Sequence, residues 1–162
     1  MDAFIDWIVG TRLSWFVTEF RWVWPITETL HFCGLTLLAG TVGLFDFRVL
    51  GFAKGIAPST LHAALPWGIA GFVVSVVTGV MFISGTPDQY FYNDAFKLKA
   101  VFLALMGANA VLFYRREFAR VRTLGPHDDA PRSAKLVAAA SLVFLFAVIL
   151  CGRMITFFRP PY

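Results

Sequence analysis

The segment LPWGIAGFVVSVVTGVMFIS, residues 65–84, contains twenty consecutive residues without an Asp, Glu, Lys or Arg. A helix of about 20 residues crosses the bilayer's hydrocarbon core, roughly 30 Å thick, because each residue adds about 1.5 Å. The whole chain is 58% hydrophobic and only 15% charged. A soluble domain is usually about 45–50% apolar and about 25% charged. The sequence therefore indicates an integral membrane protein.

Three further apolar runs resemble this one in length. We predict four spans at about 25–50, 60–84, 96–114 and 134–157. The alternation of apolar and polar residues that marks barrel strands is absent, so helices remain as the spanning structure. Pro160 and Pro161 would stop the fourth span. The expected fold over residues 1–162 is one all-α integral membrane domain, an up-and-down bundle of four transmembrane helices.

The first 24 residues mix charged and aromatic side chains. Asp2, Asp6 and Arg12 interrupt any apolar run well short of the roughly 20 residues a span needs. Neither a cleavable signal peptide nor a span is expected here. Trp7 and Trp15 suit headgroup depth. We therefore expect an amphipathic helix over about 2–22 that lies in the membrane interface.

The net charge of +4 does not indicate a nucleic-acid partner, because the basic residues flank apolar spans and form no basic stripe. Eight of the fourteen Lys and Arg lie around the connections after the first and third spans: Arg48, Lys54, Arg115, Arg116, Arg120, Arg122, Arg132 and Lys135. Cytoplasmic loops carry such an excess. These connections are therefore expected in the cytoplasm and both termini outside.

Ionisable groups gather at the opposite end of the expected bundle. Such groups cost about 2.5–3.5 kcal/mol at a span centre, so they mark pathways, cofactors or internal pairs. Glu28 and His31 are three residues apart and share one helix face. In an up-and-down bundle, six residues of the other spans lie at the same level: Thr78, Met81, Lys97, Lys99, Arg153 and Met154. We expect the charged members of this set to converge near the outer side of the bundle.

Several interpretations of this cluster stay open. Glu28 can neutralise Arg153 or a lysine, with His31 as a hydrogen-bonding core histidine. Alternatively His31 is an axial ligand of haem iron, since imidazole is a standard haem ligand and a bundle core a standard site. Glu28 would then orient the imidazole or bond a propionate, and Arg153 would offset propionate charge. Thr78 lies at the level of this candidate site.

Other metal sites fit less well. A di-iron bundle needs two Glu-x-x-His motifs, and this chain has one. Copper would suit His31 together with Met81, Met154 and the two cysteines. Those cysteines, Cys33 and Cys151, lie in apolar runs and are expected to be buried small hydrophobes rather than a disulfide. His62 lies at the other end of the bundle, which excludes a bis-histidine haem within one subunit.

Small residues recur at helical spacing on the first two spans. Gly68, Gly71, Ser75 and Thr78 form one stripe of the second span. Such stripes let helix backbones approach closely in membranes. Glycine-lined space would also accommodate a porphyrin. Both explanations remain open from the pattern alone.

Several stretches resemble an uncharacterised bacterial family of small four-span membrane proteins. They are Glu28-Thr-Leu-His31-Phe-Cys-Gly34, Asp46-Phe-Arg48-Val-Leu-Gly51, Pro66-Trp67, Gly71-Phe72, Phe96-Lys-Leu-Lys99 and Gly152-Arg153. The resemblance covers most of the chain. It implies a four-span protein of the bacterial inner (cell) membrane and brings no activity with it.

The chain is more distantly similar to the four-helix membrane protoporphyrinogen oxidases of bacteria and to copper-resistance-type membrane domains. In the oxidases, a histidine on the first span and a lysine opening a later span are associated with haem b. His31 and Lys99 match those positions, so the similarity implies haem b with these two residues as candidate iron ligands. Tyr114-Arg115 stands where a histidine often ends that family's helix, which argues against oxidation of protoporphyrinogen itself.

The function expected from these observations is that of a membrane-embedded b-type haem protein with a redox or electron-transfer role near the outer face. Its cofactor site would comprise His31, Lys99, Glu28, Arg153 and Thr78. The expected partners are the lipid bilayer, a quinone or a redox partner protein, and further copies of the chain. If it is an enzyme, it would be a haem-dependent oxidoreductase. The alternatives are copper handling or small-solute transport without haem, and a structural self-associating protein.

Overall fold

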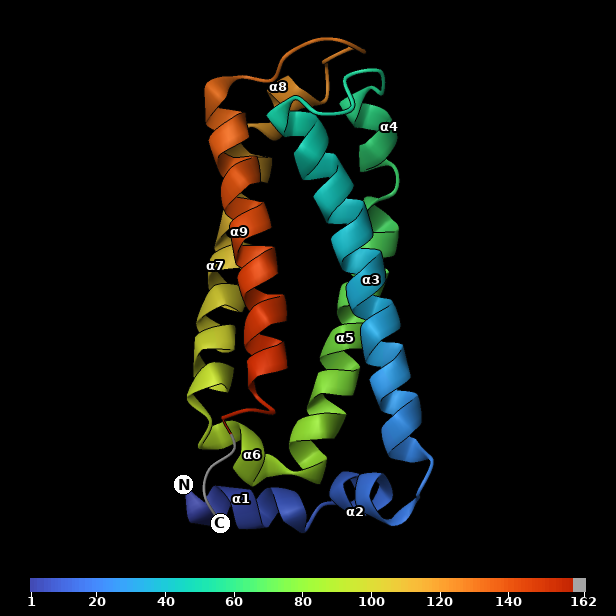
Figure 1. The fold of residues 1–162 in the computed structure, drawn as a ribbon, viewed down its shortest axis with the longest axis vertical. Coiled ribbons are helices and arrows are strands. Elements are labelled where there is room, and N and C mark those ends of the chain that lie inside the picture. The colour runs from blue at the N-terminus through green and yellow to red at the C-terminus, as the bar shows by residue number, and fades with distance from the viewer. Residues whose placement is uncertain (159–162) are drawn as a thin grey trace.

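The computed structural model describes residues 1–158, and its regular structure there consists of helices only (Figure 1). Four long helices make up most of the molecule: α3 (Val23–Leu50), α5 (Leu65–Gly85), α7 (Asp94–Arg116) and α9 (Arg132–Met154). Five short helices complete it: α1 (Asp2–Val9), α2 (Arg12–Glu19), α4 (Pro58–His62), α6 (Pro87–Phe91) and α8 (Phe118–Val121). The prediction of an all-helical chain is confirmed for these residues.

Four helical segments are long and apolar enough to cross a membrane: Val23–Leu50, Pro58–Gly85, Asp94–Arg116 and Arg132–Met154. They coincide with the four predicted spans, so the chain has the character of a multi-pass membrane protein. The second segment starts earlier than predicted, because Pro58 opens a separate short helix, α4, ahead of α5. The predicted stop at Pro160 and Pro161 lies outside the described residues.

The long helices pack as two pairs, α3 with α5 and α7 with α9. The pairs contact one another mainly through α3 and α9. In Figure 1 the two pairs stand side by side along the long axis, and α1 and α2 lie across the end of the molecule where α6 is found. α1 packs against α6, and α2 packs against the end of α5. The first 20 residues therefore cover one end of the long helices.

Glycines bring α3 and α5 into close contact. A Cβ atom added to Gly34 would lie 2.6 Å from the Gly71 carbonyl oxygen and from Ser75 Oγ. One added to Gly71 would lie 2.5 Å from the Gly34 carbonyl oxygen, and one added to Gly68 would lie 2.2 Å from Thr41 Oγ1. No side chain fits at these positions. Close helix packing, one of the two explanations for the small-residue stripe, therefore accounts for these three glycines.

The end of the molecule opposite α6 has an apolar core in which Arg48 is buried. Phe45, Val49, Phe113, Val121 and Ala134 are among the buried members of that core. Arg48 has no exposed surface, and its guanidinium donates hydrogen bonds to the backbone carbonyls of Ile56, Gly125 and Asp128. It thus joins the two connections at this end and is not a surface residue flanking a span.

Two details differ from the sequence expectations. The predicted amphipathic helix over about 2–22 is two helices, because the chain turns at Gly10 and Thr11 Oγ1 caps α2 by accepting a hydrogen bond from the Ser14 amide. Cys33 is exposed, whereas Cys151 is buried. Cys33 precedes Gly34, which faces α5, and neighbouring helix positions point about 100° apart. The prediction that both cysteines are buried is therefore wrong for Cys33.

Candidate functional site

The centre of the candidate site is a contact between α3 and α5. His31 Nδ1 lies 2.8 Å from Thr78 Oγ1. The helices run antiparallel with Gly34 against Ser75, so positions three residues before Gly34 and three after Ser75 face each other. The glycine contact thus positions the imidazole against the hydroxyl. Thr78 is 3% exposed, and the edge of the Phe82 ring packs against the imidazole with centroids 5.4 Å apart.

The hydrogen bonds of Thr78 favour one of the two neutral tautomers of His31. Thr78 Oγ1 has one proton, which it donates to the carbonyl oxygens of Val74 at 2.7 Å and Ser75 at 3.2 Å. With its proton used in this way, the hydroxyl oxygen can accept from His31, which favours the tautomer with the proton on Nδ1. In the neutral ring the remaining nitrogen, Nε2, carries a free lone pair. A metal ligand requires such a nitrogen.

Lys99 comes to this level from the other helix pair. It lies near the start of α7, and its charge is close enough to act on His31. Its Nζ lies 3.4 Å from the position a Cβ atom would take at Gly152 of α9, so the glycine makes room for the amine. Within residues 1–158, Lys99 takes part in neither a hydrogen bond nor an ion pair. The side chain is half-buried without a polar partner there.

Glu28 lies on the same helix as His31 but is exposed. Its negative charge acts on Tyr90 of α6. Burial raises the pKa of Tyr90 to about 12, and the negative charge of Glu28 contributes to the same shift. The Tyr90 ring packs on Phe96 with centroids 5.3 Å apart. Tyr90, which was not among the residues expected from the sequence, is therefore within electrostatic reach of Glu28.

The two remaining cations of the predicted cluster point elsewhere. Arg153 is exposed, and its guanidinium carbon lies 5.4 Å from the centre of the Phe157 ring. Lys97 forms an exposed ion pair of 2.8 Å with Asp94 on the same helix. Of the five ionisable groups, Lys99 is the cation whose charge acts on His31. Glu28, Lys97 and Arg153 are arranged around them at the surface.

Asn93 fixes the start of α7 and with it the level of Lys99. Its Oδ1 accepts from the amides of Ala95 and Phe96, and its Nδ2 donates to the carbonyl oxygens of Ile155 at 3.0 Å and Phe158 at 2.8 Å. Asn93 is 1% exposed. The sequence signal for it is the N-cap preference of asparagine directly before a helix. The sequence analysis did not use this signal.

Two of the soft ligands considered for copper have defined surroundings in the structure. Cys33 is exposed, and Met81 Sδ accepts a hydrogen bond from Thr27 Oγ1 at 3.8 Å. A group of three or more His, Cys, Asp and Glu side chains able to hold a metal ion does not occur in the part of the chain that the structure describes.

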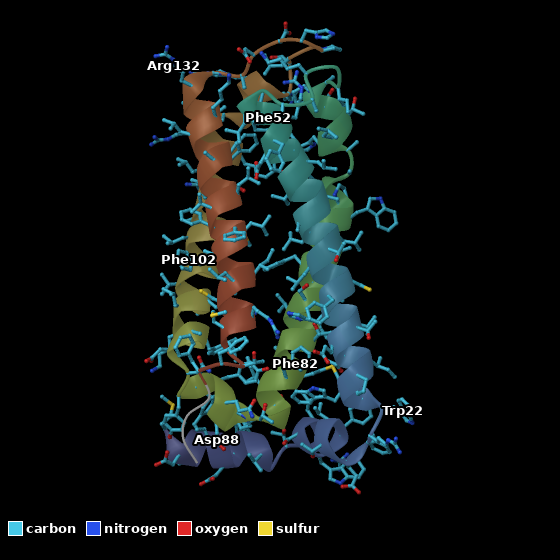
Figure 2. All side chains as sticks on the ribbon, in the orientation of Figure 1. Trp22, Phe52, Phe82, Asp88, Phe102 and Arg132 are labelled. Atoms are coloured by element: carbon cyan, nitrogen blue, oxygen red, sulfur yellow. The ribbon has the colours of Figure 1, made fainter. Side chains whose placement is uncertain are left out.

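His62 lies at the other end of the molecule, as its position in the sequence predicted. Its Nε2 is 3.2 Å from the Tyr114 hydroxyl, and its ring packs on Phe118 with centroids 4.7 Å apart. Figure 2 shows the two ends through labelled residues: Arg132 and Phe52 mark the end of His62, and Asp88 and Phe82 mark the end of His31.

Comparison with known proteins identifies a family and no activity. A family model described as "Family of unknown function (DUF6644)" matches residues 4–158. No curated protein matches, and no solved structure matches. The more distant similarity to protoporphyrinogen oxidases and copper-resistance-type domains therefore has no support from these comparisons.

Proposed function

The chain belongs to the DUF6644 family of unknown function, and because the family supplies no activity, we propose one from the site. The protein is a membrane-embedded b-type haem protein with a redox or electron-transfer role. His31 would be the principal residue that holds its iron. The single observation that carries this proposal is the hydrogen bond from His31 Nδ1 to Thr78 Oγ1.

That hydrogen bond fits the donor chemistry a haem requires. Metal-binding histidines donate their other ring N–H to a fixed acceptor, which sets the tautomer and the ring orientation. Thr78 is such an acceptor because its own proton is used on Val74 and Ser75 of its helix. Nε2 is thereby left as the ligand atom.

Lys99 would be the second residue that holds the iron. A lysine ligand must be the neutral amine, and an amine removed from water loses its proton more readily. Lys99 is half-buried next to Gly152 and has no carboxylate within ion-pair distance in residues 1–158. Glu28 would accept a hydrogen bond from a protonated propionate or orient the site through Tyr90. Arg153 would offset propionate charge, as charge-assisted bonds to carboxylates do.

The bound haem would supply one-electron oxidation and reduction of its iron. Phe82 beside His31 would limit water at the ligand, and low polarity around the ring would tune its potential. A quinone or a partner redox protein would exchange the electron near the outer face. If turnover occurs, the protein is a haem-dependent oxidoreductase.

The same proposal includes a placement in the bilayer. The four spans form an up-and-down bundle in a bacterial inner membrane, and α1 and α2 lie in the outer interface. The connections rich in Arg and Lys face the cytoplasm, and both termini lie outside. Exposed Trp7, Trp15 and Trp22 on and beside α1 and α2 support an interfacial position. The protein is expected to assemble with further copies of itself.

Visible spectroscopy of the purified protein tests the haem. We expect a Soret band in the oxidised protein, a shift on reduction with dithionite, and haem b in an acid extract. His31→Ala should abolish the band, whereas His62→Ala, at the other end, should retain it. Colourless protein that carries stoichiometric copper would contradict the haem proposal and support the copper-handling alternative. Colourless, metal-free protein that self-associates would support the alternative of a structural protein.

A further inference from the structure

A cavity of about 220 Å³ lies at the end of the molecule opposite the candidate haem site. Its apolar wall consists of Phe45, Pro58, Phe118 and Val121, from the three helices α3, α4 and α8 around the connections. Pockets for drug-sized ligands usually measure about 300–1,000 Å³. This cavity is therefore sized for one compact group and not for a whole cofactor.

Three polar side chains open into the same cavity: Ser59, His62 and Arg122. The Phe118 ring lies between two of them, with the His62 ring centroid at 4.7 Å and the Arg122 guanidinium carbon at 6.0 Å. The His62 ring is also positioned by a hydrogen bond of 3.2 Å between its Nε2 and the Tyr114 hydroxyl. A hydroxyl, an imidazole and a guanidinium around one small space form a set of donors suited to an anion.

The charge at this end is positive, and its arginines are not paired with carboxylates in residues 1–158. The five arginines in and beside α8 and at the adjoining helix ends form no ion pair within residues 1–158: Arg115, Arg116, Arg120, Arg122 and Arg132. Nearby carboxylates are engaged elsewhere. Glu117 is buried and accepts from Ser133 Oγ at 2.9 Å, and Asp129 pairs with Lys54 and Lys135.

We propose that this cavity binds the phosphate group of an anionic phospholipid, with Arg122 as its principal charged partner. The spanning helices end at this level, so the cavity lies at headgroup depth once those helices occupy the bilayer. Guanidinium groups hold phosphate through paired N–H donors, and basic pockets beside spans bind anionic headgroups. The phosphate occupies the cavity, and the glycerol and acyl chains extend from it toward the bilayer. The assignment is independent of the haem.

Lipid titration of the detergent-purified protein, read by native mass spectrometry, tests this assignment. The probes are dioleoyl phosphatidylglycerol, dioleoyl phosphatidylcholine with the same acyl chains, and inorganic phosphate. We expect one tightly retained phosphatidylglycerol, weaker retention of phosphatidylcholine, and no displacement of the lipid by millimolar phosphate. Equal retention of the two lipids, or displacement of the lipid by inorganic phosphate, would show that the cavity is not a site for an anionic phospholipid.

Two variants with one matched control locate the site. Arg122→Gln should weaken phosphatidylglycerol binding about tenfold, since one charge-assisted contact is lost. Arg132→Gln removes an equally unpaired arginine that does not line the cavity and should bind as the wild type does. Ser59→Phe fills the cavity while retaining every charge and should also abolish tight binding. Equal losses of lipid binding in Arg122→Gln and Arg132→Gln would mean that diffuse surface charge attracts the lipid, which would refute the proposal. Wild-type binding by a folded Ser59→Phe would also refute it, because the filled cavity could not hold the phosphate.

Discussion

His31 Nδ1 and Thr78 Oγ1, 47 residues apart in the chain, lie 2.8 Å from each other across the contact between α3 and α5. The pair connects packing with chemistry. Gly34 and Gly71 allow the helices to approach, the approach brings the hydroxyl to the imidazole, and the hydroxyl favours one tautomer. Each of these steps can be disturbed separately.

Thr78→Val tests the last step. Valine keeps the shape of the side chain but cannot accept from Nδ1, so the imidazole loses its fixed orientation. Removal of a partner that orients a metal ligand typically lowers metal affinity about 10–100-fold. We expect haem content and retention during dilution to fall correspondingly. Thr36→Val is the control, because the Thr36 hydroxyl bonds the Phe32 carbonyl of its own helix and faces outward. Wild-type haem retention in Thr78→Val would show that Thr78 does not orient His31 as a ligand of the iron.

Gly71→Ala tests the helix contact. The added Cβ would lie 2.5 Å from the Gly34 carbonyl oxygen and 2.8 Å from Leu37 Cβ, so α3 and α5 must separate. Overpacking of this kind costs about 1–3 kcal/mol. The melting temperature in detergent should fall. Gly40→Ala, where nothing lies within 4 Å of the added atom, should leave it unchanged or raise it. Equal melting temperatures for the two variants would contradict the observed contact.

The spans could be predicted because a bilayer requires length and apolarity, which are properties of a continuous run of residues. Residues 65–84 show both without reference to any other part of the chain. The division of the N-terminal segment at Gly10 and Thr11 was also visible as a glycine followed by an N-cap residue, but amphipathicity over about 2–22 suggested one helix. Local capping determined the outcome.

The candidate site was harder to predict because side-chain direction depends on how each helix is rotated. Depth alone grouped His31, Thr78, Lys99, Glu28 and Arg153. The Gly34–Ser75 contact sets the rotation of α3 against α5, and it places His31 on Thr78. No comparable sequence signal relates α9 to α3 at this level, so the exposed position of Arg153 over Phe157 could not be foreseen. Arg48 was misjudged for a similar reason, since only the folded connections provide its three carbonyl partners.

Arg48→Gln tests the connection between those two loops. Glutamine cannot reach the carbonyls of Ile56, Gly125 and Asp128 at once, so buried acceptors lose their partners. Hydrogen bonds to a charged group contribute about 1.5–3 kcal/mol each. We expect a lower melting temperature and faster cleavage by subtilisin within 51–57 and 122–131. Arg116→Gln changes an exposed arginine and should resist cleavage as the wild type does. Equal cleavage of both variants would show that Arg48 does not hold the loops.

The pH dependence of Tyr90 tests the position of Glu28. Burial is the larger cause of its pKa of about 12, and the Glu28 charge is the second. Because the folded state favours the neutral phenol, its contribution to stability is complete below the ordinary pKa of 10.0 and is lost as the pH rises through about 12. Phenolate absorbance should show a late transition, and the part of it that Tyr90→Phe removes belongs to Tyr90.

Glu28→Gln should move that late transition to lower pH while leaving it above the ordinary value, since burial persists when the charge is removed. Glu19→Gln is the matched control, because Glu19 lies at the same end of the molecule but does not contribute to the Tyr90 pKa. A late transition that stays in place in Glu28→Gln would mean that the carboxylate is too far from the phenol to act on it. The role of Glu28 beside His31 would then be lost, whereas the pairing of His31 with Thr78 would be unaffected, because it depends on α3 and α5 alone.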